Sequence, residues 1–490
     1  GIPTDQDLAL LKLMGIRWIV DAELWAWTQD QPDDAIELKH VEMVRSFKER
    51  GFEPIVGLGS APKWANGNHW ASAPPIDPHM DAWQTFARTV AEAYRGHTVW
   101  FQAWNEPNNS NTFWQPKPWN TEKRAGIAKD LQMAMYKGII EGNPEAKVIA
   151  GNFAGVPDDW FQLWLDEPST LEVQDAMSGH PYCKVTREEN WAHKHPPEPN
   201  LVPRLLAARA VMDANGAKEQ PMFFTEYGWF TPETPPEKQA RWTARQIIIH
   251  HAYRLKTKTE AICIFSPSDI KNGHNIFRLR QDILPGGHRF LPVIGAHATA
   301  GAILNGTVPD EPEETPSTGK RVYSFTRDEE NTWVAWSLEN DPTPEVTLPL
   351  AGRVARSTDM LGHISLVHFD EQGLLTLPDN HDPIYVSTVN VARPEANTRR
   401  LVLSKEQPST TLQMANIGSG TSKVSLSVNV PWLSVGQQAL TLSNDQIATV
   451  TLRLDAALLS NEVASGQLTI TSADLTSPII IHIQVYPAEK

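Results

Sequence analysis

A glutamate follows a short apolar run at a point where a strand must end. Residues 100–104 read Trp-Phe-Gln-Ala-Trp, and Asn105, Glu106 and Pro107 come directly after them. A short apolar run indicates a buried strand, and Pro107 cannot continue a strand ladder because it lacks an amide hydrogen. The sequence therefore predicts an amide and a carboxyl group side by side at the C-terminal end of a strand.

A second glutamate ends another apolar run. Residues 222–226 read Met-Phe-Phe-Thr-Glu, and Tyr227 and Gly228 follow. One glutamate at a strand end is often an ion-paired or capping residue, but two in such contexts favour chemistry. A pair of carboxyl groups can supply the proton donor and the nucleophile of a double displacement at a glycosidic bond. In that reaction one carboxyl group must hold a proton and the other must be ionised.

Seven apolar runs in the first 305 residues are predicted to be strands, with helical patterns between them. The predicted strands cover residues 16–21, 53–58, 99–104, 147–151, 175–180, 222–226 and 261–265. The predicted helices cover residues 5–14, 81–95, 121–141, 201–215 and 236–256, because apolar side chains recur there at helical spacing. Strands and helices in alternation predict parallel βα units.

The length of these units predicts an α/β fold in which residues 1–305 form a (β/α)8 TIM barrel. Seven strands are found and a helix comes first, so we expect the opening strand either to precede Gly1 in a longer natural chain or to be degenerate at the extreme start of this one. With that strand counted, Glu106 ends the fourth strand and Glu226 ends the seventh. Active sites of such barrels lie at the C-terminal ends of the strands, which is where both glutamates fall.

The chain changes character after Gly301. Residues 308–319 are rich in Pro, Glu and Thr and predict a linker. Short strands with turn residues between them then predict two small all-β sandwich domains. The predicted domains are 1–305 for the catalytic barrel, 306–392 for an accessory β-sandwich and 393–490 for an immunoglobulin-like β-sandwich.

The two glutamates and their neighbours resemble the clan A retaining glycoside hydrolases, over roughly residues 5–300. In that clan the strand-four glutamate follows an asparagine and is the acid/base, and the strand-seven glutamate is the nucleophile. The resemblance implies these roles for Glu106 and Glu226. The stretch Pro-Ile-Val-Gly-Leu-Gly at 54–59, with Pro-Lys-Trp at 62–64, looks most like glycoside hydrolase family 39 and its relatives. That family includes β-xylosidases, α-L-iduronidases and endo-acting exopolysaccharide hydrolases.

One departure from the clan pattern concerns the end of strand eight, where many members carry a tryptophan. Here residues 264–268 read Ile-Phe-Ser-Pro-Ser, and no tryptophan occurs between Trp242 and Trp333. Another side chain must therefore form that part of the sugar site.

Side chains at other predicted strand ends are candidates for substrate binding. The resemblance places a histidine and a tyrosine near the nucleophile, and Gly-His-Pro-Tyr at 179–182 supplies them. Tyr182 can donate a hydrogen bond that keeps Glu226 ionised, and His180 can contact Glu106 or the sugar. Asn105 can bond the sugar 2-hydroxyl. The remaining candidates, each of which has a purely structural alternative, are Glu23, Trp27, Trp64, Asn152 and Trp229.

The last segment has a resemblance of its own. Asn-Ile-Gly-Ser-Gly at 416–420, Trp-Leu-Ser-Val at 432–435 and Gly-Gln-Leu-Thr-Ile at 466–470 resemble bacterial immunoglobulin-like modules of the BACON type. The similarity covers only residues 396–490. Few acidic residues, no histidine other than His482 and regular strand alternation predict that this segment carries no chemistry of its own.

Composition narrows the classes of function. The chain has 490 residues and a formal net charge of −15, without a basic block, which argues against nucleic acid and anionic membranes as partners. No apolar run reaches the length of a membrane-spanning helix. Two cysteines, Cys183 and Cys263, are too few for a disulfide framework or a metal cluster. No phosphate loop, metal spacing or dinucleotide fingerprint is present, so we expect no cofactor and no metal.

These observations predict a retaining β-glycoside hydrolase that cleaves an oligo- or polysaccharide and is secreted or displayed on the cell surface. The high tryptophan count, 18, suits a carbohydrate cleft. The alternative is a catalytically silent carbohydrate-binding or adhesive protein built on the same barrel. Both glutamates favour the enzyme, because a binding protein has no need of two costly adjacent carboxylates. The sugar, the mode of attack and the oligomeric state stay open.

Overall fold

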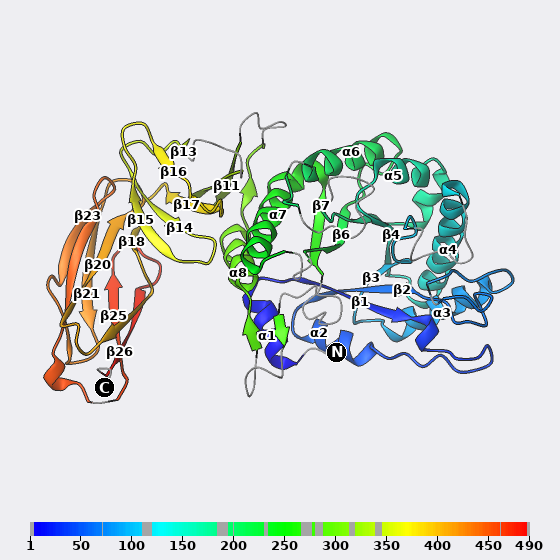
Figure 1. Cartoon of the computed structure of the whole chain (residues 1–490), viewed down its shortest axis with the longest axis horizontal. Coiled ribbons are helices and arrows are strands. Elements are labelled where there is room, and N and C mark those ends of the chain that lie inside the picture. The colour runs from blue at the N-terminus through cyan, green and yellow to red at the C-terminus, as the bar shows by residue number, and fades with distance from the viewer. Residues whose placement is uncertain are drawn as a thin grey trace. The chain divides into compact units, whose positions relative to one another are not determined.

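The computed structural model describes residues 4–70, 72–109, 120–183, 195–198, 200–229, 234–265, 277–279, 288–312, 319–338, 345–460 and 462–487. The chain divides into two compact units, Gly1–Ala302 and Ile303–Lys490. Figure 1 shows the first unit as mixed helix and strand and the second as strand.

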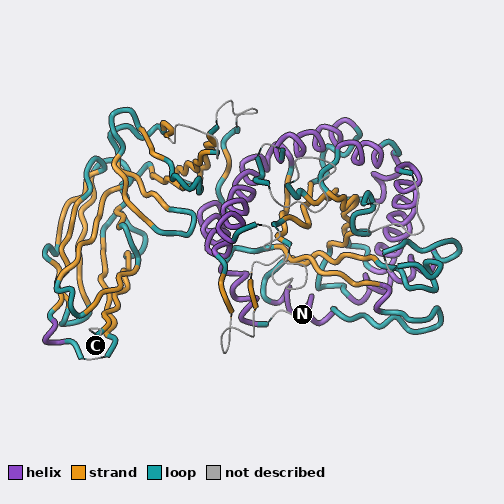
Figure 2. Tube along the Cα trace, in the orientation of Figure 1, coloured by secondary structure: helices purple, strands orange, loops and turns teal. Residues whose placement is uncertain are grey.

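The first unit is built on a parallel sheet of seven strands that lie in chain order, from β1 to β7. Its strands are β1 (Trp18–Leu24), β2 (Glu53–Gly59), β3 (Trp100–Gln102), β4 (Lys147–Ala154), β5 (Ala176–His180), β6 (Met222–Tyr227) and β7 (Thr259–Ile264). Figure 2 shows the sheet curled on itself with helices on its outside. The predicted parallel α/β organisation is confirmed, and each strand lies where an apolar run predicts it. The eighth strand of a full (β/α)8 barrel stays a prediction, since the described part of this sheet has seven.

Helices follow most of the strands, as the alternating pattern predicts. They are α1 (Asp5–Leu13), α2 (Val41–Glu49), α3 (Met80–Ala93), α4 (Thr121–Gly142), α5 (Asp158–Leu165), α6 (Leu201–Ala214), α7 (Pro236–Thr257) and α8 (Pro292–Leu304), with 3-10 turns η1 (Trp25–Trp27) and η2 (Pro168–Val173). Helices α3 and α4 approach closely because two glycines of α4 face α3. A Cβ at Gly138 or Gly142 would clash with the backbone carbonyls of Gln84 or Arg88.

Apolar side chains from every strand of the sheet meet inside its curve. This cluster contains Trp18, Val20, Ile55, Trp100, Ile149, Ala176, Phe223 and Ala261. Phe223 on β6 packs edge-on against Trp18 on β1, with ring centroids 5.4 Å apart, and lies 4.7 Å from the ring of Trp100. Strands at opposite ends of the hydrogen-bonded order thus share one core, which holds the sheet in its curled form.

The second unit consists of β sheets, as the short alternating runs predict. The first part has a six-stranded sheet, β10 (Val308–Pro309), β11 (Lys320–Arg327), β12 (Glu330–Ser337), β17 (Ile384–Val389), β14 (Val354–Thr358) and β15 (Ile364–His368), and a pair, β13 (Glu345–Thr347) and β16 (Leu374–Thr376). Their buried residues, such as Ala335, Leu350 and Phe369, form a core of their own.

The last part of the second unit has two facing groups of strands. One sheet is β18 (Pro394–Ala396), β20 (Ser409–Asn416), β24 (Ala448–Leu454) and β22 (Leu433–Val435). The other is β19 (Arg400–Ser404), β26 (Ile479–Tyr486), β25 (Ala464–Thr471), β21 (Thr421–Val428) and β23 (Ala439–Ser443). All these pairings are antiparallel except that of β19 with β26, and a 3-10 turn, η3 (Ala456–Leu458), follows β24. The division of this unit at residues 392 and 393 stays a prediction.

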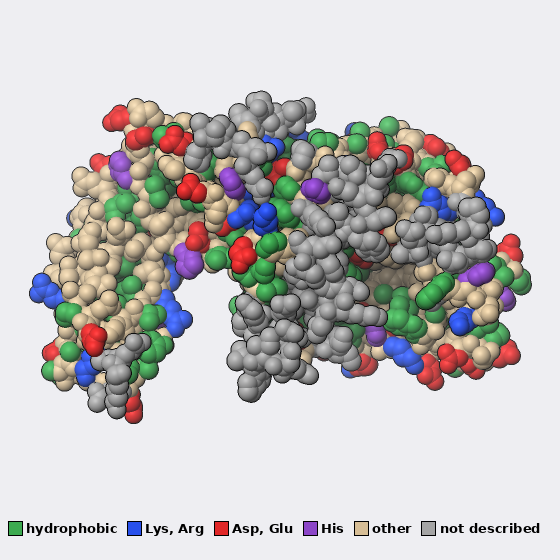
Figure 3. Space-filling model, viewed as in Figure 1, with side chains coloured by type: hydrophobic (Ala, Val, Ile, Leu, Met, Phe, Trp, Pro, Cys, Tyr) green, Lys and Arg blue, Asp and Glu red, His purple; other side chains and the backbone are tan. Residues whose placement is uncertain are grey.

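Three further features complete the description. A small antiparallel pair, β8 (Phe277–Leu279) and β9 (His288–Phe290), lies between β7 and α8 in the sequence. None of the described helices has the length and the apolar composition needed to cross a bilayer. On the face shown in Figure 3, basic side chains are scattered among acidic ones.

Candidate active site

Four consecutive strands, β3 to β6, bring five of the predicted site residues together at their C-terminal ends. Glu106 follows β3, Asn152 lies near the end of β4, His180 ends β5 and Tyr182 follows it, and Glu226 lies near the end of β6. Because these strands are parallel neighbours in the sheet, their carboxyl ends share one edge. We call these five residues the strand-end cluster.

The backbone at the start of the cluster is unusual at two non-glycine residues. Glu106 and Asn152 both have φ of +48°, in the left-handed region, which costs free energy and occurs often at functional sites. The register of β4 against β5 shifts between Ala150 and Phe153, so Asn152 sits in a bulge. The backbone amide of Glu106 donates to the carbonyl of Asn152 at 3.0 Å. The bulge therefore ties the Glu106 loop to β4 and turns both side chains to the site.

The two glutamates lie close together, with a histidine between them. One carboxylate oxygen of Glu106, one of Glu226 and a ring nitrogen of His180 all lie within 4.8 Å of one another. The Nδ1 atom of His180 is 2.8 Å from Oε1 of Glu106 and 3.6 Å from Oε2 of Glu226. The hydroxyl of Tyr182 donates to Oε2 of Glu226 at 3.0 Å. The two carboxylates and the imidazole thus form one compact group.

Burial and charge act in opposite directions on the cluster. Burial lowers the pKa of His180, but the charges of Glu226 and Glu106 and the hydrogen bond to Glu106 outweigh it, so the net pKa is raised. Burial raises the pKa of Glu226; His180 and Tyr182 lower it and Glu106 raises it, and the net direction is upward. Burial and both carboxylates raise the pKa of Tyr182 well above its usual value. The phenol thus stays protonated and able to donate.

Asn152, a member of the strand-end cluster, also belongs to a layer of buried polar side chains beneath it. Oδ1 of Asn152 is 2.9 Å from Nε2 of His180 and accepts a hydrogen bond from the hydroxyl of Thr225 at 2.8 Å. Ser178 lies 3.0 Å from the Thr225 hydroxyl. Asn152, Ser178 and His180 are all buried, at 1% exposure or less. This layer holds the imidazole in place from the side away from the carboxylates.

Sequence reasoning missed three members of the site. Thr225 and Ser178 belong to the buried layer, and Asn109 donates from Nδ2 to Oε2 of Glu106 at 3.0 Å. The position of Thr225 directly before Glu226, and that of Asn109 three residues after Glu106, were available as signals. Ser178 carried no signal, because a serine within an apolar strand has many structural uses.

The remaining predicted site residues are placed differently. Oε1 of Glu23 accepts hydrogen bonds from the amides of Lys39 and His40 and from the hydroxyl of Tyr94, and Glu23 is 1% exposed. These bonds fix a loop and helix α3 to β1. Asn105 is exposed, next to Glu106, with Oδ1 3.5 Å from Nδ2 of Asn152.

The three tryptophans among the candidates also differ from one another. Trp229 is 1% exposed and packs beside Trp242, and its indole donates to the carbonyl of His195 at 2.9 Å. Trp64 is partly buried and packs edge-on against Trp25 at 5.3 Å. Trp27 is 65% exposed, which leaves its ring face open to a ligand. The residues around the expected strand-eight tryptophan position, 266–276, lie outside the described part of the chain.

Glu106, His180 and Glu226 are also, among the described residues, the one group of His, Cys, Asp or Glu side chains close enough to hold a metal ion. The ring nitrogen that would bind an ion already faces Glu106 at hydrogen-bond distance. Protein hydrogen bonds therefore satisfy this cluster without a metal, and the expectation of no metal stays a prediction.

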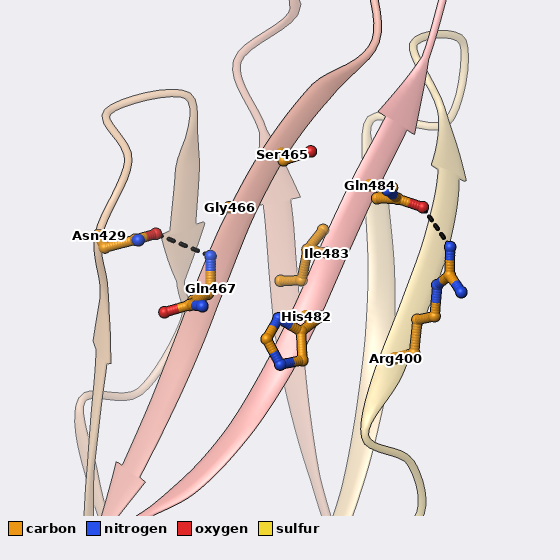
Figure 4. Close-up of a pocket in the computed structure, with 8 residues that line it drawn as sticks. All are labelled: Arg400, Asn429, Ser465, Gly466, Gln467, His482, Ile483 and Gln484. Atoms are coloured by element: carbon orange, nitrogen blue, oxygen red, sulfur yellow. Dashed lines mark hydrogen bonds between the residues drawn. The ribbon is translucent and has the colours of Figure 1, made fainter. Parts of the chain in front are cut away.

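A depression on the second unit, of about 610 Å³, is lined by residues of β19, β25 and β26 (Figure 4). Two hydrogen bonds join residues of its lining. Arg400 donates to Gln484, and Asn429 accepts from the backbone amide of Gln467 at 2.7 Å. It holds no residue of the strand-end cluster.

The curled sheet corresponds to a known architecture. In fold, the chain is similar to solved glycoside hydrolases. A family 39 glycoside hydrolase from Bacteroides cellulosilyticus WH2 is 18% identical, with a TM-score of 0.60 over 79% of each chain. A family 30 subfamily 8 xylanase from Clostridium acetobutylicum is 13% identical, with a TM-score of 0.52 over 79% of this chain and 92% of that one.

A third similar structure extends over both units. BuGH86, solved in complex with neoagarooctaose, is 10% identical, with a TM-score of 0.54 over 98% of this chain and 92% of that one. No protein-family profile matches the chain, and no curated protein matches it in sequence. The likeness is thus one of fold, and the chemistry has to be argued from the site.

Proposed function

We propose that this protein is a retaining β-glycoside hydrolase that cleaves an oligo- or polysaccharide by double displacement. The observation that carries the proposal is the pair of carboxylates, with oxygens of Glu106 and Glu226 within 4.8 Å of each other. Retaining enzymes hold their two carboxyl groups about 5–5.5 Å apart, whereas inverting enzymes need about 6.5–9.5 Å to admit a water. The separation supports a covalent glycosyl-enzyme over direct attack by water.

In the first step Glu226 attacks the anomeric carbon and Glu106 gives its proton to the leaving oxygen. The bond from carbon to the leaving group breaks as the bond to Oε of Glu226 forms. In the second step Glu106 takes a proton from a water, which attacks the same carbon and releases Glu226. Tyr182 supports the first role, since its hydrogen bond favours the ionised form of Glu226.

His180 supplies the charge balance that this pair requires. A buried carboxylate beside a second carboxylate tends to take up a proton, and the net pKa of Glu226 is indeed raised. The imidazole 3.6 Å away opposes that tendency whenever it carries a proton. Asn105, exposed beside Glu106, is the group that we propose for the sugar 2-hydroxyl.

The finer parts of the proposal concern the family, the sugar partner, the last module and the location. Likeness to a family 39 enzyme supports assignment to that family over its clan relatives, and the oligosaccharide bound to BuGH86 supports a sugar partner. We also propose that residues 393–490 form a BACON-type module without catalytic residues, and that the protein acts outside the cell. The second part of the chain is strand-rich throughout, which suits such a module.

The test is turnover of a panel of aryl β-glycosides and β-linked polysaccharides, with NMR of the first-formed product. We expect the product to have the anomeric configuration of the substrate, and Glu226→Gln to abolish turnover. Glu106→Gln should affect substrates with poor leaving groups most, and added azide should restore cleavage of an activated aryl glycoside by this variant. Release of the inverted anomer would refute the mechanism. Binding of oligosaccharides without any turnover would favour the silent carbohydrate-binding protein.

A further inference from the structure

The buried imidazole of His180 has an oxygen in front of each ring nitrogen. Nε2 lies 2.9 Å from Oδ1 of Asn152 and 3.3 Å from Oγ1 of Thr225. Nδ1 lies 2.8 Å from Oε1 of Glu106. Each short contact needs one hydrogen between its two atoms, so the protonation of the ring is set by what its partners can donate.

The orientation of the Asn152 amide decides the first contact. Its Nδ2 faces the backbone carbonyl of Ala103 at 3.4 Å, and a carbonyl can only accept, so the NH2 group must lie on that side. Oδ1 therefore faces His180. The Thr225 hydroxyl donates to the same Oδ1 at 2.8 Å, which is consistent with an oxygen there. An unprotonated Nε2 would direct its lone pair at the lone pairs of Oδ1, 2.9 Å away, and the two would repel. Nε2 must therefore carry the hydrogen.

We propose that Asn152 is a positioning residue that fixes His180 as the Nε2–H tautomer, and that this obliges the Glu106–His180 pair to carry one proton between them. The proposal rests on the function proposed above. It assigns Asn152 a role beneath the site instead of a contact with sugar, in keeping with its 1% exposure.

The proton count follows from the tautomer. With Nε2 protonated, a neutral His180 offers only a lone pair at Nδ1, so the proton on the 2.8 Å bond must come from a protonated Glu106. If the proton moves across that bond, the pair becomes an imidazolium and a carboxylate. The two arrangements differ by one transfer and hold the same total charge. Both contain the proton that the leaving group needs.

The fixed Nε2–H tautomer also serves the second step of the proposed reaction. Once Glu106 has protonated the leaving group, its carboxylate faces the Nδ1 lone pair, and the two repel. Glu106 therefore takes a proton readily from the attacking water, which restores the starting count. If the ring could change tautomer, an Nδ1–H would stabilise the bare carboxylate and weaken it as a base.

The other titratable groups around the cluster bear on the same proton. Glu226 on β6 lies 3.6 Å from Nδ1, and its negative charge favours retention of the proton. Tyr182 after β5 donates to Glu226. Cys263 on β7 stays a neutral thiol, because burial and the charge of Glu226 raise its pKa to about 12. None of these groups competes with Asn152 for Nε2.

The direct test is the tautomer itself, read by NMR of the full chain with ¹⁵N-labelled histidine. A spectrum tuned to the long-range couplings of the imidazole distinguishes Nε2–H from Nδ1–H, and the signal lost in His180→Gln assigns the ring. We expect wild-type His180 to be the Nε2–H tautomer when neutral. An Nδ1–H tautomer would overturn the proposal. This readout needs no substrate, so it decides the question even if Asn152 variants fail to fold or the protein cleaves no glycoside.

The kinetic test is the basic limb of the kcat/KM profile on a glycoside with a poor leaving group. Asn152→Ala removes the acceptor of Nε2–H. Neutral His180 can then adopt the Nδ1–H tautomer and donate to the Glu106 carboxylate, so the Glu106–His180 pair loses its shared proton more easily. We expect the limb to move about one to two pH units lower, because that shift corresponds to the free energy of one hydrogen bond to a charged group. Tyr227→Phe, which removes a buried hydroxyl that has no hydrogen-bond partner among the described residues, is the matched control and should leave the limb in place. An unmoved limb in folded Asn152→Ala would overturn the proposal, whereas absence of turnover by the wild type would refute the proposed function instead.

Discussion

The hydrogen bond from Tyr182 to Glu226 offers a sharp test of how the nucleophile stays ionised. The variant Tyr182→Phe removes the hydroxyl that donates to Oε2 of Glu226 at 3.0 Å and keeps the ring. Glu226 must be ionised to attack, so the acid limb of kcat/KM marks the pH at which it takes up a proton. Because Tyr182 lowers the pKa of Glu226, its loss moves that limb to higher pH and narrows the active range from the acid side.

The size of the effect follows from the geometry. A hydrogen bond from a neutral donor to a charged acceptor contributes about 1.5–3 kcal/mol, and one pKa unit corresponds to about 1.4 kcal/mol. The acid limb should therefore rise by about one to two pH units. At pH values well above the limb Glu226 is ionised in both proteins, so kcat/KM of Tyr182→Phe should approach that of the wild type. The assay is initial-rate hydrolysis of one aryl β-glycoside from pH 4 to pH 9.

Tyr227 provides a matched control one residue from the nucleophile. It is 1% exposed, and its hydroxyl has no hydrogen-bond partner among the described residues. Tyr227→Phe removes a phenolic hydroxyl at the end of β6 and should leave the acid limb where it is. A limb that shifts equally in both variants, or in neither while Tyr182→Phe stays folded, would refute the reasoning.

Three further outcomes are expected. Dialysis against EDTA should leave activity unchanged, because protein hydrogen bonds already engage the glutamate and histidine atoms that could hold a metal; loss of activity with recovery on adding one divalent metal would contradict this. A chain that stops at about Pro394 should keep its activity on a small soluble glycoside within tenfold, because the strand-end cluster lies in the first compact unit. Phe223→Ala should lower the free energy of unfolding by about 3–5 kcal/mol in urea, since its fully buried ring contacts both Trp18 and Trp100; a change below 1 kcal/mol would show that the shared core is not closed.

The sequence predicts the strands of the first unit well because burial makes the inner ones, β2, β4, β5 and β6, nearly continuous apolar runs. Each of the seven runs lies within a strand of the structure or overlaps one. The turn residues that end these runs then locate Glu106, His180 and Glu226 at one edge. Position along the chain shows which side chains stand at strand ends. That information was enough to predict the glutamate pair and the Tyr182 contact as hypotheses.

Position along the chain does not supply the direction in which a side chain points. Glu23 stands at the end of β1 but faces helix α3 and the 39–40 loop, where three donors hold it. Trp229 stands three residues after Glu226 and packs into a buried cluster. Asn152 sits in a bulge with left-handed φ, a local geometry that no residue type demands. Such choices depend on packing between elements, which apolar periodicity does not encode.

The strand-end cluster is best understood as a single group that shares protons. Ionising both Glu106 and Glu226 at this separation costs free energy, because the two negative charges repel. A buried, charged His180 in turn needs these carboxylates to stabilise its charge. Burial, with the charge of Glu106, raises the pKa of Glu226, and the two carboxylates raise the pKa of His180 against the effect of its burial. One proton on the Glu106–His180 bond leaves Glu226 free to be the anion, with Tyr182 donating to it. The buried layer of Asn152, Thr225 and Ser178 then decides on which side of the imidazole that proton is found, and hence which glutamate can act as the acid.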